Sequence, residues 1–165
     1  MSRLRHYLKN IACLESIWDE DLENRMSVRP VLELTSYATG AKFIYLTCNT
    51  KPELKHNLGL LWKRKGYGIL LLSFHGEPGK IELAGTLVNL ESLAWMMGTH
   101  FAGWVVHFAS CSTVKIDEER MAKFVALTKV AMVLGYTEAV DWTDGSVMDL
   151  LLLSRLQDYR NVRSL

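Results

Sequence analysis

The chain has 165 residues, of which 49% are apolar and 22% are charged. These values match one compact globular domain and exclude a largely disordered chain. Its 19 basic and 18 acidic side chains leave a formal charge of +1, so no overall charge attracts it to nucleic acid or to an anionic membrane. We expect a single α/β domain over residues 1–165, with neither nucleic acid nor membrane as a partner.

The cysteine pattern indicates a reducing compartment. Cys13, Cys48 and Cys111 are widely spaced and odd in number, which differs from a disulfide framework. The N-terminus is too polar for a signal peptide, and no apolar run reaches the roughly 18 residues that a membrane-spanning helix needs. The sequence therefore predicts a cytoplasmic protein. It carries no paired CxxC zinc signature, and we expect neither a metal nor another cofactor.

Apolar runs of strand length and helical repeats bounded by capping residues alternate along the chain. In chain order we expect a strand over 11–14, a loop over 18–25, a helix over 27–40 that Ser27 caps, a strand over 42–48, a helix over 50–65 and a strand over 69–74. These are followed by a strand over 80–83, a helix over 90–97, a strand over 105–109, a helix over 117–128, strands over 129–134 and 139–142, and a helix over 146–159.

The densest basic cluster is Lys63, Arg64 and Lys65, directly before Gly66. We expect a helix to end there, because cations stabilise a helix C-terminus and glycine caps it. Nucleic-acid binding by this cluster is the alternative.

The alternation of strands and helices is typical of a parallel sheet with right-handed crossover connections. We therefore predict an α/β fold of three layers, with an open, mainly parallel sheet of about five or six strands and helices on both faces. Side chains at the core positions of these elements should be buried. They are Val31, Leu34, Ile44, Leu70, Leu72, Val106, Phe108, Val133 and Leu151.

Two residues with catalytic potential follow predicted buried strands. His75 comes directly after the strand over 69–74, and Cys111 follows the strand over 105–109. In open α/β sheets, sites lie beyond the carboxyl ends of the strands, and neighbouring strands are about 4.8 Å apart. An imidazole beside a thiol takes its proton and makes it a nucleophile. The two positions therefore predict a dyad of Cys111 and His75.

Gly76 follows His75 and has no side chain, so its backbone N–H can approach a substrate. The amides of Gly76 and Cys111 are candidates for an oxyanion hole. By contrast, Cys13 and Cys48 lie inside predicted strands, and we interpret them as buried core residues. His107 also lies within a strand, and we expect it to be a core or supporting histidine.

The stretches Leu72–Gly76 and Phe108–Thr113 resemble the His-Gly and small-residue-Cys signatures of caspase-like cysteine peptidases. The similarity is closest to the CHAT branch, which joins caspases with tetratricopeptide-associated proteins. It continues through 130–134, 140–144 and the helix over 146–159. This resemblance implies a caspase-like fold, with Cys111 as nucleophile, His75 as general base, and the amides of Gly76 and Cys111 as oxyanion hole. The N-terminal part also resembles small bacterial proteins with a His-Gly and Ser-Cys pair, for which no substrate is implied.

Three acidic residues are candidates for substrate binding. Asp141 and Asp144 lie where related folds place an acidic specificity residue, and Glu77 follows the His-Gly pair. A carboxylate in the pocket favours arginine or lysine before the scissile bond. The alternative makes Asp144 a helix N-cap and Asp141 part of a solvated turn.

These patterns predict a cysteine endopeptidase that acts on a peptide or protein substrate and is regulated by a protein partner. A catalytically silent module that binds a peptide or small ligand in the same cleft is the alternative, and the reactivity of Cys111 separates the two. A nucleotide-binding, flavodoxin-like domain ranks last, because residues 76–80 lack the Walker spacing and no strand carries the dinucleotide glycine fingerprint. The oligomeric state stays open.

Overall fold

The structure, a computed structural model, describes residues 9–19, 21, 23 and 26–160. Its strands form a central parallel sheet in the order β2-β1-β3-β7-β8 and a small antiparallel sheet in the order β4-β5-β6. The strands are β1 (Asn10–Glu15), β2 (Phe43–Thr47), β3 (Tyr67–Ser73), β4 (His75–Glu77), β5 (Lys80–Leu83), β6 (Thr86–Asn89), β7 (Val105–Phe108) and β8 (Met132–Gly135). The helices are α1 (Arg29–Thr39), α2 (Lys51–Leu61), α3 (Leu90–Met97), α4 (Glu118–Thr128) and α5 (Trp142–Arg155), with a 3-10 turn, η1 (Gly98–Phe101).

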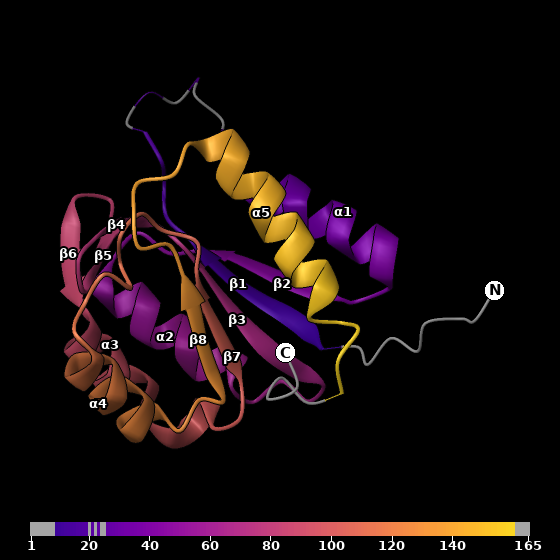
Figure 1. The fold of residues 1–165 in the computed structure, drawn as a ribbon. Coiled ribbons are helices and arrows are strands. Elements are labelled where there is room, and N and C mark those ends of the chain that lie inside the picture. Colours follow the sequence, from indigo (N-terminus) through magenta and orange to yellow (C-terminus); the bar gives the residue numbers. More distant parts are fainter. Residues whose placement is uncertain (1–8, 20, 22, 24–25, 161–165) are drawn as a thin grey trace.

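The predicted three-layer α/β architecture is confirmed. Helices α1 and α5 cover one face of the central sheet, and α2, α3 and α4 cover the other (Figure 1). Successive residues of β3 point to opposite faces, so Ile69 and Leu71 pack under α1 and α5 while Leu70 and Leu72 pack under the other helices. A central strand buried on both faces explains the unbroken apolar run in the sequence.

Three helices on the α2–α4 side begin at polar side chains that accept a backbone N–H of the first turn. Thr50 and Glu53 form a reciprocal capping box at α2. Asn89 caps α3, and Asp117 caps α4. Local capping chemistry therefore sets these starts, which lie where the sequence predicts them.

The C-terminal elements differ from the prediction. The strand expected over 129–134 is β8, displaced toward the C-terminus because Lys129 adopts a left-handed conformation that ends α4. The sixth strand expected over 139–142 is wrong. Asp141 accepts the N–H of Thr143 as the N-cap of α5, so the helix begins four residues earlier than the predicted 146 and ends at Arg155.

Two other boundaries are also wrong. Helix α2 ends at Leu61, so the cluster of Lys63, Arg64 and Lys65 lies beyond its last turn and does not cap it. The N-cap of α1 is Val28, while the Ser27 hydroxyl accepts the N–H of Arg29 from one position earlier. Residues 20, 22, 24 and 25 of the loop expected over 18–25 lie outside the described residues.

Two predicted core residues are exposed. Leu34 is 50% exposed because α1 buries a stripe of Val31, Leu32 and Thr35 and leaves Leu34 at its flank. Leu151 is 55% exposed because it lies about 200° around α5 from the buried Leu153. Ile44 and Val133 are only partly buried, whereas the remaining predicted core residues are buried. These are Val31, Leu70, Leu72, Val106 and Phe108.

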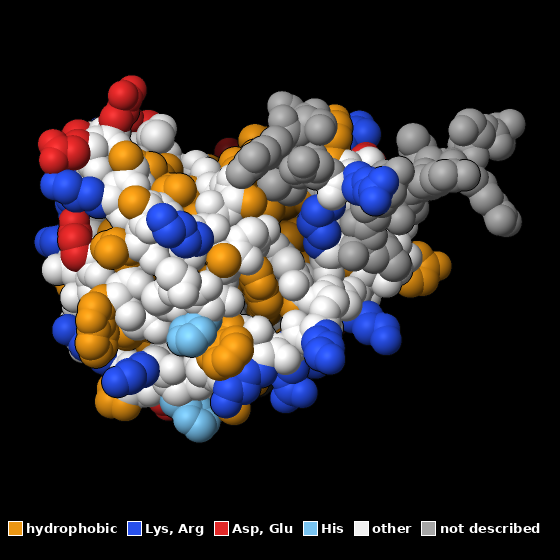
Figure 2. All heavy atoms as spheres, turned by 90° about the horizontal axis from the view of Figure 1, so that it is seen from below, with side chains coloured by type: hydrophobic (Ala, Val, Ile, Leu, Met, Phe, Trp, Pro, Cys, Tyr) orange, Lys and Arg blue, Asp and Glu red, His pale blue; other side chains and the backbone are white. Residues whose placement is uncertain are grey.

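The described surface agrees with the low formal charge. Figure 2 shows one face of the molecule, on which Lys and Arg side chains are scattered among apolar and uncharged surface rather than gathered in one patch. Among the described helices, none combines the length and the apolar character that crossing a membrane requires.

The small antiparallel sheet is fastened to the loop that follows β7. Gly79 donates its N–H to the Thr113 carbonyl at 3.0 Å, and the Thr113 hydroxyl donates to the Lys80 carbonyl at 3.0 Å. Gly76 lies so close to this loop that a Cβ added to it would be 2.2 Å from the Thr113 hydroxyl oxygen and 2.6 Å from the Cys111 carbonyl oxygen. A side chain at Gly76 would therefore displace the loop that carries Cys111.

We predict opposite effects of two glycine-to-alanine substitutions. Gly76→Ala should lower the free energy of unfolding by about 1–3 kcal/mol, because its methyl group overlaps backbone and side-chain atoms. Gly59→Ala, in α2 with no heavy atom within 4 Å of the new Cβ, should raise it by about 0.5–1 kcal/mol. Urea denaturation of both variants checks this, and equal stability of Gly76→Ala and the unsubstituted protein would contradict the packing argument.

Candidate functional site

The candidate site lies where the strand order of the central sheet reverses. The chain places β2 on one side of β1 and β3 on the other, and β7 then pairs with β3. Loops diverge at such a point, which leaves a crevice beyond the carboxyl ends of the strands. Trp18 follows β1, His75 follows β3 and Cys111 follows β7. The topology therefore brings these three residues to one edge of the sheet.

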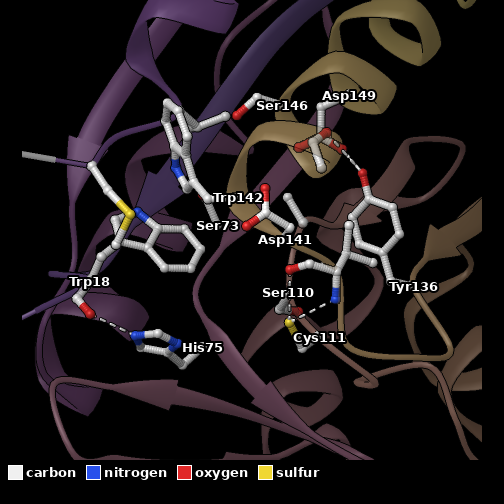
Figure 3. A pocket seen from close by; sticks show the side chains of 15 residues that line it. Trp18, Ser73, His75, Ser110, Cys111, Tyr136, Asp141, Trp142, Ser146 and Asp149 are labelled. Atoms are coloured by element: carbon white, nitrogen blue, oxygen red, sulfur yellow. Dashed lines mark hydrogen bonds between the residues drawn. The ribbon is translucent and has the colours of Figure 1, made fainter.

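His75 is exposed and is held by Trp18 in two ways. Its Nε2 lies 2.7 Å from the Trp18 carbonyl oxygen, and the two rings stand edge to face with centroids 5.0 Å apart (Figure 3). A carbonyl only accepts hydrogen bonds, so we assign the proton of the neutral ring to Nε2. This assignment leaves the lone pair of His75 Nδ1 able to accept a proton.

Cys111 lies half-buried in the turn after β7, where Ser112 adopts a left-handed conformation with φ 55°. Its Sγ accepts the N–H of Val140 at 3.5 Å and donates to the Val140 carbonyl at 3.7 Å. Among the described residues no hydrogen bond joins Cys111 to His75. Figure 3 shows both side chains at one cavity, with His75 beside Trp18 and Cys111 on the side of Tyr136.

The cavity between them has a volume of about 160 Å³. The rings of Trp18, Tyr136 and Trp142 contribute to its wall, and two carboxylates, Asp141 and Asp149, also line it. No Lys or Arg is present among the described residues that line the cavity. The site is thus an aromatic cavity with two acidic groups.

Asp149 belongs to a buried polar cluster at this cavity. Its Oδ1 accepts from Tyr136 at 2.5 Å and lies 2.7 Å from His107 Nε2. Only 4% of Asp149 and 2% of His107 is exposed, and the Nδ1 of His107 is buried without a hydrogen-bond partner in the described structure. Burial and the hydrogen bond to Asp149 raise the pKa of Tyr136. The predicted supporting role of His107 thus has a defined partner.

A second hollow, of about 360 Å³, shares Trp18 and His75 with the first. Glu82 and Asp19 contribute acidic side chains to its lining. His75 therefore borders two depressions of different character, one largely aromatic and one more polar.

The predicted site residues separate into two groups. His75, Cys111 and Asp141 line the first cavity together. Glu77 is exposed and pairs with Lys80 at 3.2 Å, and neither cavity includes it among its lining residues. Asp144 lies in the first turn of α5 and is likewise absent from both linings, while Asp141 serves as the N-cap. The capping role that the alternative gave to Asp144 thus belongs to Asp141.

The two other cysteines are core residues, as predicted. Cys13 and Cys48 are fully buried. Burial, followed by the charges of Glu15 and Asp149, raises the pKa of Cys13 well above its usual value. Burial and the charge of Glu53 raise the pKa of Cys48 to about 12. Both thiols therefore stay protonated near neutral pH.

Sequence reasoning missed Trp18, Tyr136, Trp142 and Asp149 of the cavity wall, and Glu15, which accepts a hydrogen bond from the Trp18 indole. Two of them left a signal, because Glu15 ends an apolar strand and Asp149 interrupts the apolar run of α5. Acidic residues at such positions are expected to be hydrogen-bonded when buried. Trp18 and Tyr136 lie in irregular segments, where periodicity carries no information.

No group of three or more His, Cys, Asp or Glu side chains that could hold a metal ion occurs within the described part of the chain. No curated protein matches the sequence. One family model covers almost the whole chain, matching residues 8–165. The protein therefore belongs to the family of unknown function DUF6642.

Proposed function

We propose that the protein is a cysteine endopeptidase of the caspase-like type, with Cys111 as nucleophile and His75 as general base. The observation that carries the proposal is that both side chains border one cavity at the switch point of a parallel sheet. The resemblance of the two sequence motifs to caspase-like peptidases supports the same roles. Both arguments are independent of the family assignment, because the function of that family is unknown.

In the proposed reaction, Cys111 Sγ leaves the Val140 backbone and passes its proton to His75 Nδ1. The thiolate attacks the carbonyl carbon of the scissile bond, and the carbonyl electron pair moves to the oxygen. When the C–N bond breaks, the amine leaves with the proton from His75. Water then attacks the thioester while His75 accepts one of its protons. When the C–S bond breaks, His75 returns this proton to the sulfur, which releases the acid and restores the Cys111 thiol.

The backbone amides of Gly76 and Cys111 form the proposed oxyanion hole. The close approach of Gly76 to the Cys111 turn supports this assignment, because a side chain at Gly76 would overlap the atoms that shape the turn. Preorganised N–H donors of this kind stabilise the charge that develops on the carbonyl oxygen.

The cavity favours a basic side chain before the scissile bond. Aromatic rings attract a cation to their faces, and carboxylates form charge-assisted hydrogen bonds with guanidinium or ammonium groups. Trp142 and Asp141 supply these features at the start of α5, and Asp149 adds a second carboxylate. Because both hollows border His75, a peptide can extend into one hollow on each side of the scissile bond.

We place this activity in the cytoplasm, under control of a protein partner. The three free thiols, Cys13, Cys48 and Cys111, support the reducing compartment.

One observation favours a second candidate function, a module that binds a peptide without cleaving it. The Cys111 thiol has both of its hydrogen bonds to Val140 rather than to His75. Catalytic hydrogen bonds often form only in the complex with substrate, so cleavage requires the thiol to leave Val140 when a substrate binds, whereas binding alone does not. The two functions are separated by cleavage and by thiol reactivity.

Cys111→Ala and His75→Ala should each abolish cleavage, by about 10³-fold or more, because nucleophile and base act as one unit. The double variant should be no worse than either single variant. A panel of fluorogenic peptides, with melting curves for each protein, measures both properties.

His107→Ala serves as the comparison, and should act through stability, because it leaves the buried Asp149 without one of its partners. We expect it to lower the free energy of unfolding by about 1–3 kcal/mol. Cleavage by Cys111→Ala would contradict the mechanism, and a lack of cleavage by the unsubstituted protein would favour the binding module.

Iodoacetamide should label Cys111 faster than Cys13 or Cys48, by roughly tenfold or more at pH 8. Cys111 is partly exposed, whereas burial raises the pKa of the other two thiols. Peptide mapping after brief labelling measures the order, with the urea-unfolded protein as control. Equal labelling of all three cysteines in the folded protein would rule out a specially reactive Cys111.

Asp141→Asn should lower the preference for an arginine over a neutral residue before the scissile bond by about tenfold. Asparagine still caps a helix, so the substitution removes charge from the cavity and keeps the start of α5. Asp144→Asn removes a charge from the same helix turn outside the cavity and should change the preference by less than about twofold. Ratios of kcat/KM for peptide pairs that differ only in the residue before the scissile bond measure the preference. Equal effects of the two variants would contradict the assignment of Asp141 as the residue that binds a basic side chain.

A further inference from the structure

Glu15 is a buried carboxylate at the end of β1, with only 3% of the residue exposed. Its described hydrogen-bond partners are all uncharged donors, and they come from four segments of the chain. They are the Trp18 indole at 2.7 Å, the Val28 N–H at 2.7 Å, the hydroxyls of Ser27 and Tyr45 at 2.6 Å each, and the Ser73 hydroxyl at 3.4 Å. Five donors converge on one carboxylate.

A carboxylate at this position is costly unless it is fully hydrogen-bonded, and an apolar residue would continue the pattern of β1. The donors explain how Glu15 is tolerated. They also tie the end of β1 to the start of α1, to β2 and to the end of β3. Burial and Glu15 together raise the pKa of Tyr45 to about 12.

Glu15 is linked to the candidate site through Trp18. The Trp18 indole N–H donates to Glu15 Oε1, while the backbone carbonyl of the same residue accepts the Nε2–H of His75. Ser73, two residues before His75, donates to the same Oε1. The carboxylate thus restrains both the acceptor of the His75 proton and the strand end that carries His75.

We propose that Glu15 is a positioning residue of the site. By holding the Trp18 indole, it fixes the Trp18 carbonyl against His75 Nε2 and so leaves His75 Nδ1 as the nitrogen that takes the Cys111 proton. The catalytic meaning of this role rests on the proposed function, but the restraint on the imidazole does not.

Two variants separate positioning from plain stabilisation. Trp18→Phe and Tyr45→Phe each remove one donor to Glu15 and keep an aromatic ring, and the lost bonds are 2.7 and 2.6 Å long. Tyr45 contacts Oε2, the oxygen that does not bond Trp18. Because the Trp18 ring also contacts His75 directly, Glu15→Leu, which leaves Trp18 in place, shows whether the hydrogen bond to Glu15 itself restrains the imidazole.

The experiment is NMR of protein labelled with ¹⁵N in its histidine rings, recorded above the pH of histidine titration. The spectrum of His75→Gln identifies the His75 signals, and exposed His56 on α2 is the internal reference for a ring that is not held. In the unsubstituted protein and in Tyr45→Phe, we expect His75 to show more of the Nε2–H tautomer than His56. In Trp18→Phe and Glu15→Leu, this excess should be lost, because neither variant can form the hydrogen bond between the indole and residue 15.

An unchanged His75 tautomer in Trp18→Phe would overturn the proposal, as would an equal loss in Tyr45→Phe. Trp18→Phe keeps the test decisive if Glu15→Leu fails to fold. Where peptide cleavage is measurable, kcat should fall about tenfold in Trp18→Phe and stay within about twofold in Tyr45→Phe. If the unsubstituted protein cleaves no peptide, the proposed function fails, and the tautomer measurement alone decides the positioning role.

Discussion

The parallel pairing of β3 with β1 on one side and β7 on the other is the constraint on which the candidate site depends. Parallel strands end at the same edge of a sheet, so three segments that are far apart in sequence meet there. The reversal of strand order between β1 and β3 opens the crevice at this edge. Trp18, His75 and Cys111 occupy it because each follows one of these strands.

Close packing links the two halves of the site. The hairpin that begins at His75 touches the Cys111 turn through Gly76, and Thr113 bonds both the backbone of Gly79 and that of Lys80. A displacement of the hairpin therefore moves the Cys111 turn, because packed backbone contacts of this kind do not deform gradually. The small antiparallel sheet therefore packs against the Cys111 turn and helps to hold it in position.

Two buried carboxylates support the site from opposite sides. Glu15 restrains the Trp18 side, and Asp149 binds Tyr136 and His107 on the Cys111 side. More than nine-tenths of each residue is buried, and one oxygen of each carboxylate has at least two hydrogen-bond partners. Polar groups of this kind contribute little net stability but allow one arrangement of neighbouring side chains. Both carboxylates lie at the edge where Trp18, His75 and Cys111 meet, which supports the proposal that this edge is the functional site.

The sequence alone determined the layers, most strands, and the positions of His75 and Cys111 at strand ends, because periodicity and capping are local properties. It misplaced the start of α5, since the cap at Asp141 depends on how the preceding loop crosses the Cys111 turn. Only the tertiary structure decided which acidic residues reach the cavity and which donors surround Glu15. Those contacts join segments remote in sequence, and their distances follow from strand order and packing, which no local pattern encodes.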